Sequence, residues 1–164
     1  MGEGASAVHI SITVNGRQED LKVPARLTLL ELLRDLLRLK GTKLSCSRAV
    51  CGSCTVLVDG TPTASCAVFA FQVNTASITT VEGLRSLDGN LHPIQQAFID
   101  HSAFQCGYCT SGMIMLTKAL LDRMPSPTRD DVVKWLSSNI CRCTGYTMII
   151  EAVLDAAYRL RETP

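Results

Sequence analysis

The 164-residue sequence predicts an α+β protein in two parts, a strand-rich half followed by a helical half. Up to about residue 82, apolar and polar residues alternate as they do in half-buried strands, whereas beyond it apolar residues recur with helical spacing. The eight cysteines fall into two groups of four, one in each half. We therefore expect two domains, residues 1–82 and residues 83–164, each with its own cysteine group.

The first half opens with a strong hairpin signal. Residues 8–14 alternate apolar and polar side chains, and Asn15-Gly16 follows as the dipeptide most typical of a two-residue hairpin turn. Residues 18–23 can then return as the partner strand. Asp59-Gly60 is a second turn signal of the same kind.

One helix and two further strands complete the predicted first domain. Thr28 and Glu31 have the spacing of a capping box and predict a helix over residues 28–37. Residues 55–58 and 77–81 are short, apolar and β-branched, as strands are. Strands wrapped around one helix, with a cysteine loop between that helix and the next strand, indicate a β-grasp, ferredoxin-like domain.

Four amphipathic segments in the second half predict a four-helix bundle joined by short connections. Thr128 and Asp131 form another capping box, which opens the third of these helices. The residues that share a face in each helix are Ile94, Ala97, Phe98 and His101; Met113, Leu116, Thr117, Leu120, Leu121 and Met124; Val132, Leu136 and Ile140; and Ile149, Ala152, Val153, Ala156, Ala157 and Leu160.

The first cysteine group has the spacing of plant-type [2Fe-2S] ferredoxins. Cys46, Cys51 and Cys54 give C-x4-C-x2-C, and Cys66 follows twelve residues later. A loop that wraps a negatively charged cluster needs small residues between its ligands, so that several backbone N–H groups can approach sulfur. Small residues do separate these cysteines, and the pattern predicts a metal site.

The second group is less decisive on spacing alone. Cys106 and Cys109 form C-x2-C, and Cys141 and Cys143 form a later C-x-C, which could ligate zinc as well as an iron–sulfur cluster. Both pairs lie at predicted ends of apolar helices, where a cluster can be buried. We also expect helix N-termini at Thr110 and Thr144 to favour a negatively charged group. These points favour a second [2Fe-2S] cluster over zinc.

Composition and charge exclude several other classes of protein. The formal net charge is +1, without a basic or acidic block, so nothing indicates a nucleic-acid partner. There is no apolar run long enough to span a bilayer, so we expect no membrane association. The N-terminus lacks the pattern of a signal peptide, and we expect a cytoplasmic protein. In that reducing compartment, eight cysteines indicate metal ligation and not a disulfide scaffold.

Three motifs together resemble one family over about residues 10–157. They are CSRAVCGSCTV from Cys46, QCGYC from Gln105, and CRCTGY from Cys141. In this combination and order they are similar to the small iron–sulfur subunit of bacterial molybdenum hydroxylases, the xanthine dehydrogenase family. Ser45, Ser111 and Ser138 depart from the family pattern, which commonly has glycine, proline and glycine there, but none removes a cysteine.

The resemblance implies two [2Fe-2S] clusters and a division of roles. Cys46, Cys51, Cys54 and Cys66 would ligate a cluster that faces FAD. Cys106, Cys109, Cys141 and Cys143 would ligate a cluster beside the molybdopterin, and Gln105 and Cys143 would contact the pterin.

The resemblance also implies partner chains. We expect a large subunit that binds molybdopterin, together with a medium subunit that binds FAD, assembled as a dimer of heterotrimers. In this arrangement the chain is an electron-transfer subunit without an active site of its own. A free-standing two-cluster ferredoxin is the alternative, although such carriers are often acidic and this chain is nearly neutral.

Overall fold

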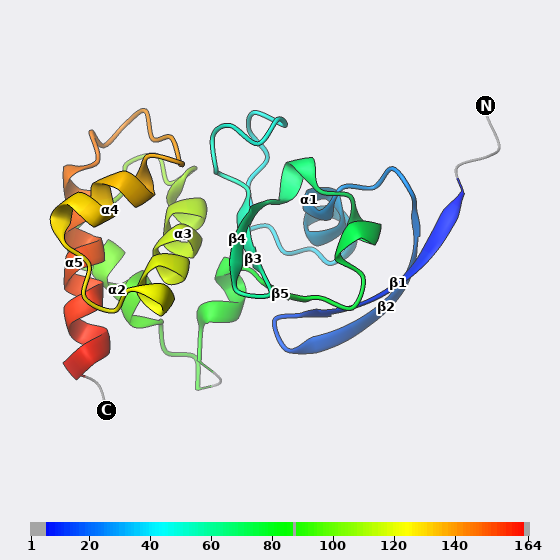
Figure 1. Ribbon diagram of the computed structural model, residues 1–164, viewed down its shortest axis with the longest axis horizontal. Helices are drawn as coiled ribbons and strands as arrows, with labels where there is room; N and C mark the ends of the chain where they lie inside the picture. Colours follow the sequence, from blue (N-terminus) through cyan, green and yellow to red (C-terminus); the bar gives the residue numbers. More distant parts are fainter. Residues whose placement is uncertain (1–5, 87, 163–164) are drawn as a thin grey trace.

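The structure is a computed structural model that describes residues 6–86 and 88–162. Its first half is a mixed five-stranded sheet and its second half a group of helices, which lie side by side in Figure 1. The α+β class predicted from the sequence is therefore confirmed. The strands, in the spatial order β2-β1-β5-β3-β4, are β1 (Ala7–Val14), β2 (Arg17–Pro24), β3 (Thr55–Val58), β4 (Thr61–Ala64) and β5 (Ser77–Thr79).

The predicted β1–β2 hairpin is confirmed. Val14 pairs with Arg17, and the two turn residues between them, Asn15 and Gly16, have φ of 50° and 80°. Positive φ at both positions is what a type I′ turn requires, and it explains why Asn-Gly is favoured there. Inward-facing Ile10, Ile12 and Val14 are buried, while their neighbours along β1 are more exposed.

Strand β4 was not predicted from the sequence. It pairs antiparallel with β3, across the predicted Asp59-Gly60 turn, and contains Pro62. Proline and threonines gave no apolar alternation, and proline is tolerated here because β4 is the edge of the sheet. Strand β5 ends at Thr79, two residues earlier than expected, because the chain turns into the 3-10 helix η4 (Val81–Leu84).

The helix after β2 starts with the predicted capping box. Thr28 Oγ1 accepts from the Glu31 N–H at 3.2 Å, and Glu31 Oε2 accepts from the Thr28 N–H at 2.8 Å. Only α1 (Leu29–Glu31) is α-helical, and the following turn, η1 (Leu32–Leu36), is a π-helix. Such π turns are uncommon and often lie next to functional sites.

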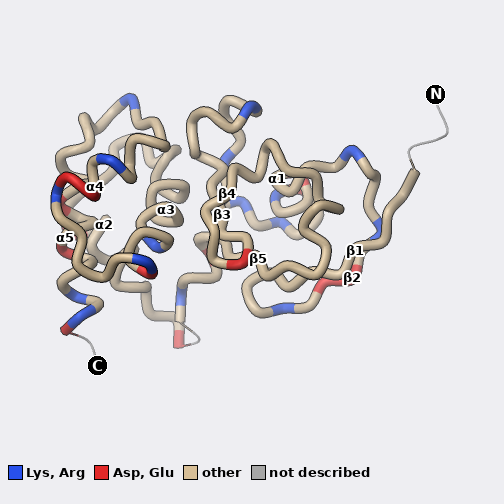
Figure 2. The backbone as a smooth tube through the Cα atoms, viewed as in Figure 1, with Lys and Arg blue, Asp and Glu red and all other residues tan. Residues whose placement is uncertain are grey.

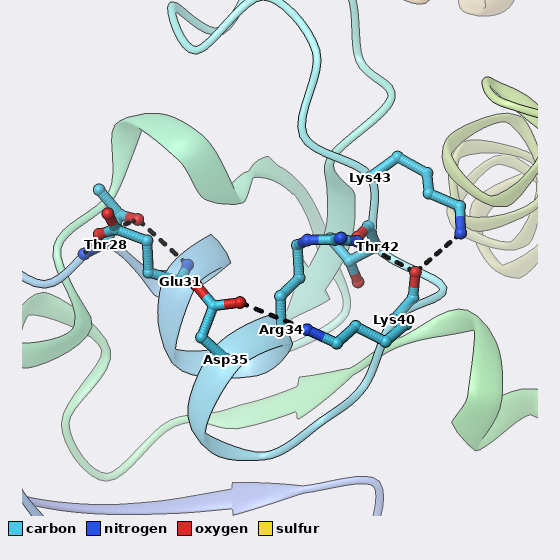
Figure 3. A network of polar contacts seen from close by, with 7 residues as sticks. All are labelled: Thr28, Glu31, Arg34, Asp35, Lys40, Thr42 and Lys43. Carbon is cyan, nitrogen blue, oxygen red and sulfur yellow. Dashed lines mark hydrogen bonds and ion pairs between the residues drawn. The ribbon is translucent and has the colours of Figure 1, made fainter.

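The end of this helix anchors the chain that leads into the first cysteine loop (Figure 3). Arg34 Nη1 donates to the carbonyl oxygens of Lys40 at 3.1 Å and Thr42 at 2.5 Å. Lys43 Nζ also donates to the Lys40 carbonyl, at 2.8 Å. These bonds fix residues 40–43, and the Lys43 N–H then donates to the Ser53 carbonyl inside the loop.

The second half contains the four predicted helices, α2 (Pro93–Asp100), α3 (Thr110–Arg123), α4 (Arg129–Leu136) and α5 (Thr147–Glu162). In the first half, two short 3-10 helices, η2 (Ser65–Ala67) and η3 (Ala70–Val73), lie between β4 and β5. Within the described ranges, no helix is long and apolar enough to cross a membrane.

Two details of the predicted helices were wrong. Helix α4 ends at Leu136, so Ile140 lies outside it and is half exposed, because the chain turns away at residues 137–139. Helix α5 begins at Thr147, and Thr144 is not at its N-terminus. The reason is local: Gly145 and Tyr146 have φ of 65° and 69°, which an α-helix does not allow.

The two halves are joined by direct contacts as well as by the chain. Leu57 of β3 packs into the core formed by the helices, and α3 lies against β3. Asn15, in the hairpin turn, exchanges two hydrogen bonds with Thr80, at 2.9 and 3.0 Å. The Gly41 N–H donates to Glu82 Oε1 at 2.7 Å. The connecting segment is thus held on both sides.

Helix α2 carries a cap that should respond to pH. Neutral His92 accepts the Ile94 N–H through Nδ1 at 3.2 Å, and burial, followed by nearby Lys118, lowers the pKa of His92. A lowered folded-state pKa means that the cap stabilises the protein above about pH 6.5 and is lost as the pH falls through the folded pKa.

Replacing His92 by serine, a good N-cap that does not titrate, should remove this pH dependence. The His92 cap should contribute about 0.5–2 kcal/mol to the free energy of unfolding, as N-caps typically do. The measurement is the free energy of unfolding of both proteins between about pH 5 and pH 8. A wild-type minus His92→Ser difference that stays constant over this interval would contradict the assignment.

Candidate iron–sulfur sites

The first cysteine group lies at the edge of the sheet. Cys46, Cys51 and Cys54 lie in the loop between η1 and β3, and Cys66 lies in η2, directly after β4. The β3–β4 hairpin brings Cys66 back beside the loop, as the Ser65 N–H bond to the Cys54 carbonyl shows. The structure therefore brings all four predicted residues together.

The backbone of this loop is curled so that N–H groups face sulfur. Ser47, Ala49 and Gly52 have φ of 55°, 56° and 69°, and left-handed residues of this kind cost energy unless the surroundings require them. The Val50 and Cys51 N–H groups each donate to Cys46 Sγ at 3.4 Å. The curl thus prepares the loop to bind negatively charged sulfur.

The surroundings of Cys46 and Cys54 shift the pKa values of these two thiols in opposite directions. Backbone N–H groups of Arg48, Cys51 and Val50 lower the pKa of Cys46 to about 6. Burial, the largest influence on Cys54, raises its pKa to about 11. A bound metal would offset the cost of ionising Cys54, because ligation deprotonates a thiol outright.

The second cysteine group lies between the ends of three helices. Cys106 and Cys109 precede α3, whereas Cys141 and Cys143 lie between α4 and α5. The Sγ atoms of Cys143 and Cys106 lie 3.6 Å apart. Burial, and then the neighbouring Cys141 thiol, raise the pKa of Cys109 to about 12. These four residues also come together.

The thiol contacts within each group fit a two-iron cluster. In a [2Fe-2S] cluster each iron takes two cysteine sulfurs, whereas structural zinc gathers four ligands on one centre. The thiol pairs in contact are Cys46 with Cys51, Cys54 with Cys66, Cys106 with Cys143, and Cys109 with Cys141.

Two unpartnered hydroxyl groups also fit a cluster at the second site. Thr110 Oγ1 and Ser111 Oγ, in the first turn of α3, are buried and have no hydrogen-bond partner among the described residues. Buried hydroxyls are normally satisfied, and a cluster bound at Cys109 would bring sulfur acceptors to this end of the helix. Ser138, another departure from the family pattern, is satisfied by the Trp135 carbonyl at 3.1 Å.

The second site is less buried than the sequence suggested. Cys106 and Cys143 are exposed on the surface of the chain, and Gln105 beside them is exposed too. Within this chain the helices leave the outer edge of the site exposed, because α4 ends at Leu136 and two of the cysteines lie in the segment between α4 and α5. Two large side chains that line the site with these cysteines, Tyr108 and Ile140, are both more than a third exposed.

The segments that carry Cys46, Cys51 and Cys54, and Cys141 and Cys143, have basic but no acidic side chains, whereas Glu31 and Asp35 line the hollow at Cys66. Residues 36–58 and residues 132–150 contain lysine and arginine but no aspartate or glutamate. In Figure 2 the two loops at the top of the view carry blue segments and no red ones. A cluster with four thiolates is anionic, so acidic neighbours would oppose both its binding and its reduction.

The two sites touch one another through hydrogen bonds. The Ile140 N–H donates to the Cys51 carbonyl at 2.9 Å, and Asn139 Nδ2 donates to the Gly52 carbonyl at 3.2 Å. The Tyr108 hydroxyl, next to Cys109, donates to the Leu44 carbonyl. The loop of one site is therefore part of the wall of the other.

Sequence reasoning did not single out the residues that make this junction. Asn139 and Tyr146 lie inside or next to the motif that contains Cys141, which was the available signal. The Tyr146 hydroxyl accepts from the Cys141 N–H at 2.8 Å and donates to the Asn139 carbonyl at 3.2 Å. Their contribution comes from contacts across the loop, which residue spacing does not reveal.

The fold and the paired cysteines define a protein that binds two iron–sulfur clusters, and family comparisons agree. Residues 12–77 match the family described as 2Fe-2S iron-sulfur cluster binding domain. Residues 80–154 match the family described as [2Fe-2S] binding domain. The chain thus has two [2Fe-2S]-binding domains.

The chain is also similar along most of its length to individual proteins. It is 50% identical over 149 residues to the nicotine 6-hydroxylase small subunit of Paenarthrobacter nicotinovorans, covering 91% of this chain and 89% of that one. It is 41% identical to the nicotinate dehydrogenase small FeS subunit of Eubacterium barkeri, covering 93% and 96%. Quinoline 2-oxidoreductase from Pseudomonas putida 86 contains a chain with a TM-score of 0.90 at 42% identity, covering 96% and 98%.

The chain belongs to the small iron–sulfur subunits of the molybdenum hydroxylases, the xanthine dehydrogenase family. It is a non-catalytic electron-transfer subunit, and the resemblance seen in its motifs is confirmed.

Tyr146→Phe tests the closing hydrogen bonds of the second loop. Loss of the hydroxyl leaves the Cys141 N–H and the Asn139 carbonyl without this partner, which should cost about 1–3 kcal/mol. We expect faster loss of visible absorbance in mild denaturant, from the second cluster first. Tyr158→Phe, at an exposed position on α5, is the matched control and should change nothing. Equal behaviour of both variants would contradict the assigned role.

Proposed function

We propose that the chain conducts electrons from a molybdopterin centre on a large partner subunit to FAD on a medium partner subunit. Cys46, Cys51, Cys54 and Cys66 ligate the cluster on the FAD side, and Cys106, Cys109, Cys141 and Cys143 ligate the cluster on the molybdopterin side. Each cluster, when bound, takes up and releases one electron at a time. The chain's own residues hold the clusters, supply hydrogen-bond donors to sulfur and exclude acidic side chains from both loops.

The observation that carries this proposal is the hydrogen bond between the two cysteine loops. Its acceptor is the carbonyl of Cys51, and its donor is the N–H of Ile140, the residue before Cys141. The two ligand sets are therefore linked by covalent bonds and one hydrogen bond of 2.9 Å. A protein that used its clusters independently would have no need to join a ligand of one to the neighbour of a ligand of the other.

The exposed edge of the second site supports a permanent partner on that side. Cys106 and Cys143 are at the surface beside exposed Tyr108 and Ile140, whereas a free carrier would leave this edge in water. We infer that the large subunit covers it and that Gln105 and Cys143 contact the pterin there. In aldehyde oxidoreductase from Desulfovibrio desulfuricans, the matched region is 17% of one longer chain, with a TM-score of 0.89 and 43% identity.

The remaining features of the assembly are also proposals. We propose a dimer of heterotrimers, since the relatives include the small subunit of one enzyme and one component of another enzyme complex. We propose the domain boundary between residues 82 and 83, within η4, whose Val81 and Leu84 both pack in the core of the helical half. The cytoplasm is the proposed location, because a reducing compartment keeps cysteines from forming disulfides and leaves them free to ligate metal.

Purification of the untagged chain from its native cells tests the assembly. We expect it to copurify with one large and one medium subunit, and to contain about four irons and about four acid-labile sulfides per chain, with no zinc. Recovery as a stable monomer that keeps both clusters would favour the free-standing carrier. Two irons with one zinc would refute the second ligand set.

Two cysteine variants test the order of the clusters in the assembled enzyme. Cys51→Ser should leave substrate-driven reduction of the molybdopterin-side cluster intact while stopping transfer to FAD. Cys143→Ser should disturb the molybdopterin-side cluster itself and block electron exit from molybdenum. Freeze-quench EPR separates the signals of the two clusters. If Cys51→Ser lost the molybdopterin-side signal and kept the other, the order would be reversed.

A further inference from the structure

Asn139 is a buried polar side chain that lies between the two cysteine loops. Only 4% of the residue is exposed, although it lies outside any helix or strand, two residues before Cys141. Its Nδ2 donates to the Gly52 carbonyl at 3.2 Å and lies 3.5 Å from Thr55 Oγ1. Both acceptors belong to the segment that carries Cys51 and Cys54.

The contact is a two-point clamp between consecutive residues. Asn139 bonds to Gly52 through its side chain, and Ile140 bonds to Cys51 through its backbone N–H. A single hydrogen bond leaves rotation about its axis, whereas two adjacent bonds fix both separation and orientation. The clamp is itself braced, because the Asn139 carbonyl accepts from the Tyr146 hydroxyl at 3.2 Å.

The glycines around the clamp show how closely the parts fit. A Cβ on Gly52 would lie 1.6 Å from Asn139 Oδ1, and a Cβ on Gly112 of α3 would lie 2.2 Å from the Gly52 carbonyl oxygen. The peptide of Gly52 is thus held between Asn139 on one side and α3 on the other. Glycine therefore occupies both positions, Gly52 and Gly112, where a side chain would push the two loops apart.

We propose that Asn139 is a positioning residue that sets the separation and orientation of the two cysteine loops, and with them the rate of electron transfer between the clusters. This inference rests on the proposed function. In the transfer, one electron leaves the cluster held by Cys106, Cys109, Cys141 and Cys143, which is oxidised, and reduces the cluster held by Cys46, Cys51, Cys54 and Cys66. No proton moves and no covalent bond is broken. Asn139 ligates neither cluster and acts through Gly52 and Ile140.

The test compares Asn139→Ala and Asn139→Asp with the wild type in the assembled enzyme. Alanine removes the donor, and aspartate keeps the shape but places an acceptor against the Gly52 carbonyl. We expect transfer between the clusters, followed by rapid-reaction absorbance and EPR, to slow by about tenfold, the scale of residues that support metal ligands. The magnetic splitting between the two reduced clusters should also change, while iron content stays at the wild-type value.

Thr117→Val is the matched control. Thr117 is a fully buried hydroxyl in α3 that donates to the Met113 carbonyl at 2.8 Å and touches neither loop. It removes a buried hydrogen bond from the same core, so a general loss of stability would appear in both variants. Only the Asn139 variants should alter the splitting and the transfer rate.

A double variant tests the fit directly. Gly52→Ala places a methyl group on Asn139, whereas Gly52→Ala with Asn139→Ala gives that methyl group room, and the backbone strain at Gly52 is the same in both. We expect the double variant to bind more of the first cluster than Gly52→Ala alone, a non-additive effect.

Two outcomes separate the inference from the function on which it rests. If both Asn139 variants bind two clusters with wild-type splitting and wild-type transfer, Asn139 does not position the loops, and the proposed function stands. If the wild-type enzyme shows no electron exchange between its clusters, the proposed function fails, and the splitting still decides whether Asn139 fixes their geometry. Should the alanine variant fail to bind clusters, the isosteric aspartate variant gives the same decision.

Discussion

The hydrogen-bonded junction between the two cysteine loops is the constraint on which the rest of the chain depends. Strand β3 and helix α3 pack together directly behind it, and the connecting segment after β5 is fixed to the β1–β2 turn and to Gly41. Two domains joined only by a linker would move relative to each other. Here the packing prevents relative motion of the two domains at the place where one ligand set meets the other. The fold therefore fixes the separation of the two sites.

A second constraint is electrostatic. Eight thiols must ionise to ligate two clusters, and the chain reduces the cost through hydrogen-bond donors that face sulfur. Left-handed residues in the first loop direct N–H groups at Cys46, the Thr144 hydroxyl donates to Cys141 Sγ at 3.2 Å, and acidic residues are absent from both segments. Backbone donors are fixed by the fold, so their positions do not change when the charge of the site changes by one electron.

What the sequence predicted well was local. The Asn15-Gly16 turn and the Thr28 and Thr128 capping boxes depend on residues a few positions apart, and the structure contains all three. What it did not predict depends on distant contacts. Strand β4 pairs with the open edge of β3, Ile140 lies beyond α4 and bonds to Cys51, and the role of Asn139 depends on its contact with Gly52. Cysteine spacing placed the ligands along the chain, but it contained no information on how the two groups face each other.

The same arrangement leaves the outer side of each site near the surface. The junction covers the inner side of both loops, so the outer sides of both remain near the surface, Val50 on one and Cys143 with Ile140 on the other. In an electron-transfer protein with two clusters, electrons enter at the outer side of one cluster and leave at the outer side of the other, while the contact between the two sites is closed. The contact between the two sites is closed here by the chain's own hydrogen bonds, while the outer side of the second site has exposed Tyr108 and Ile140 beside its cysteines. Rigidity between the two sites is therefore supplied within the chain.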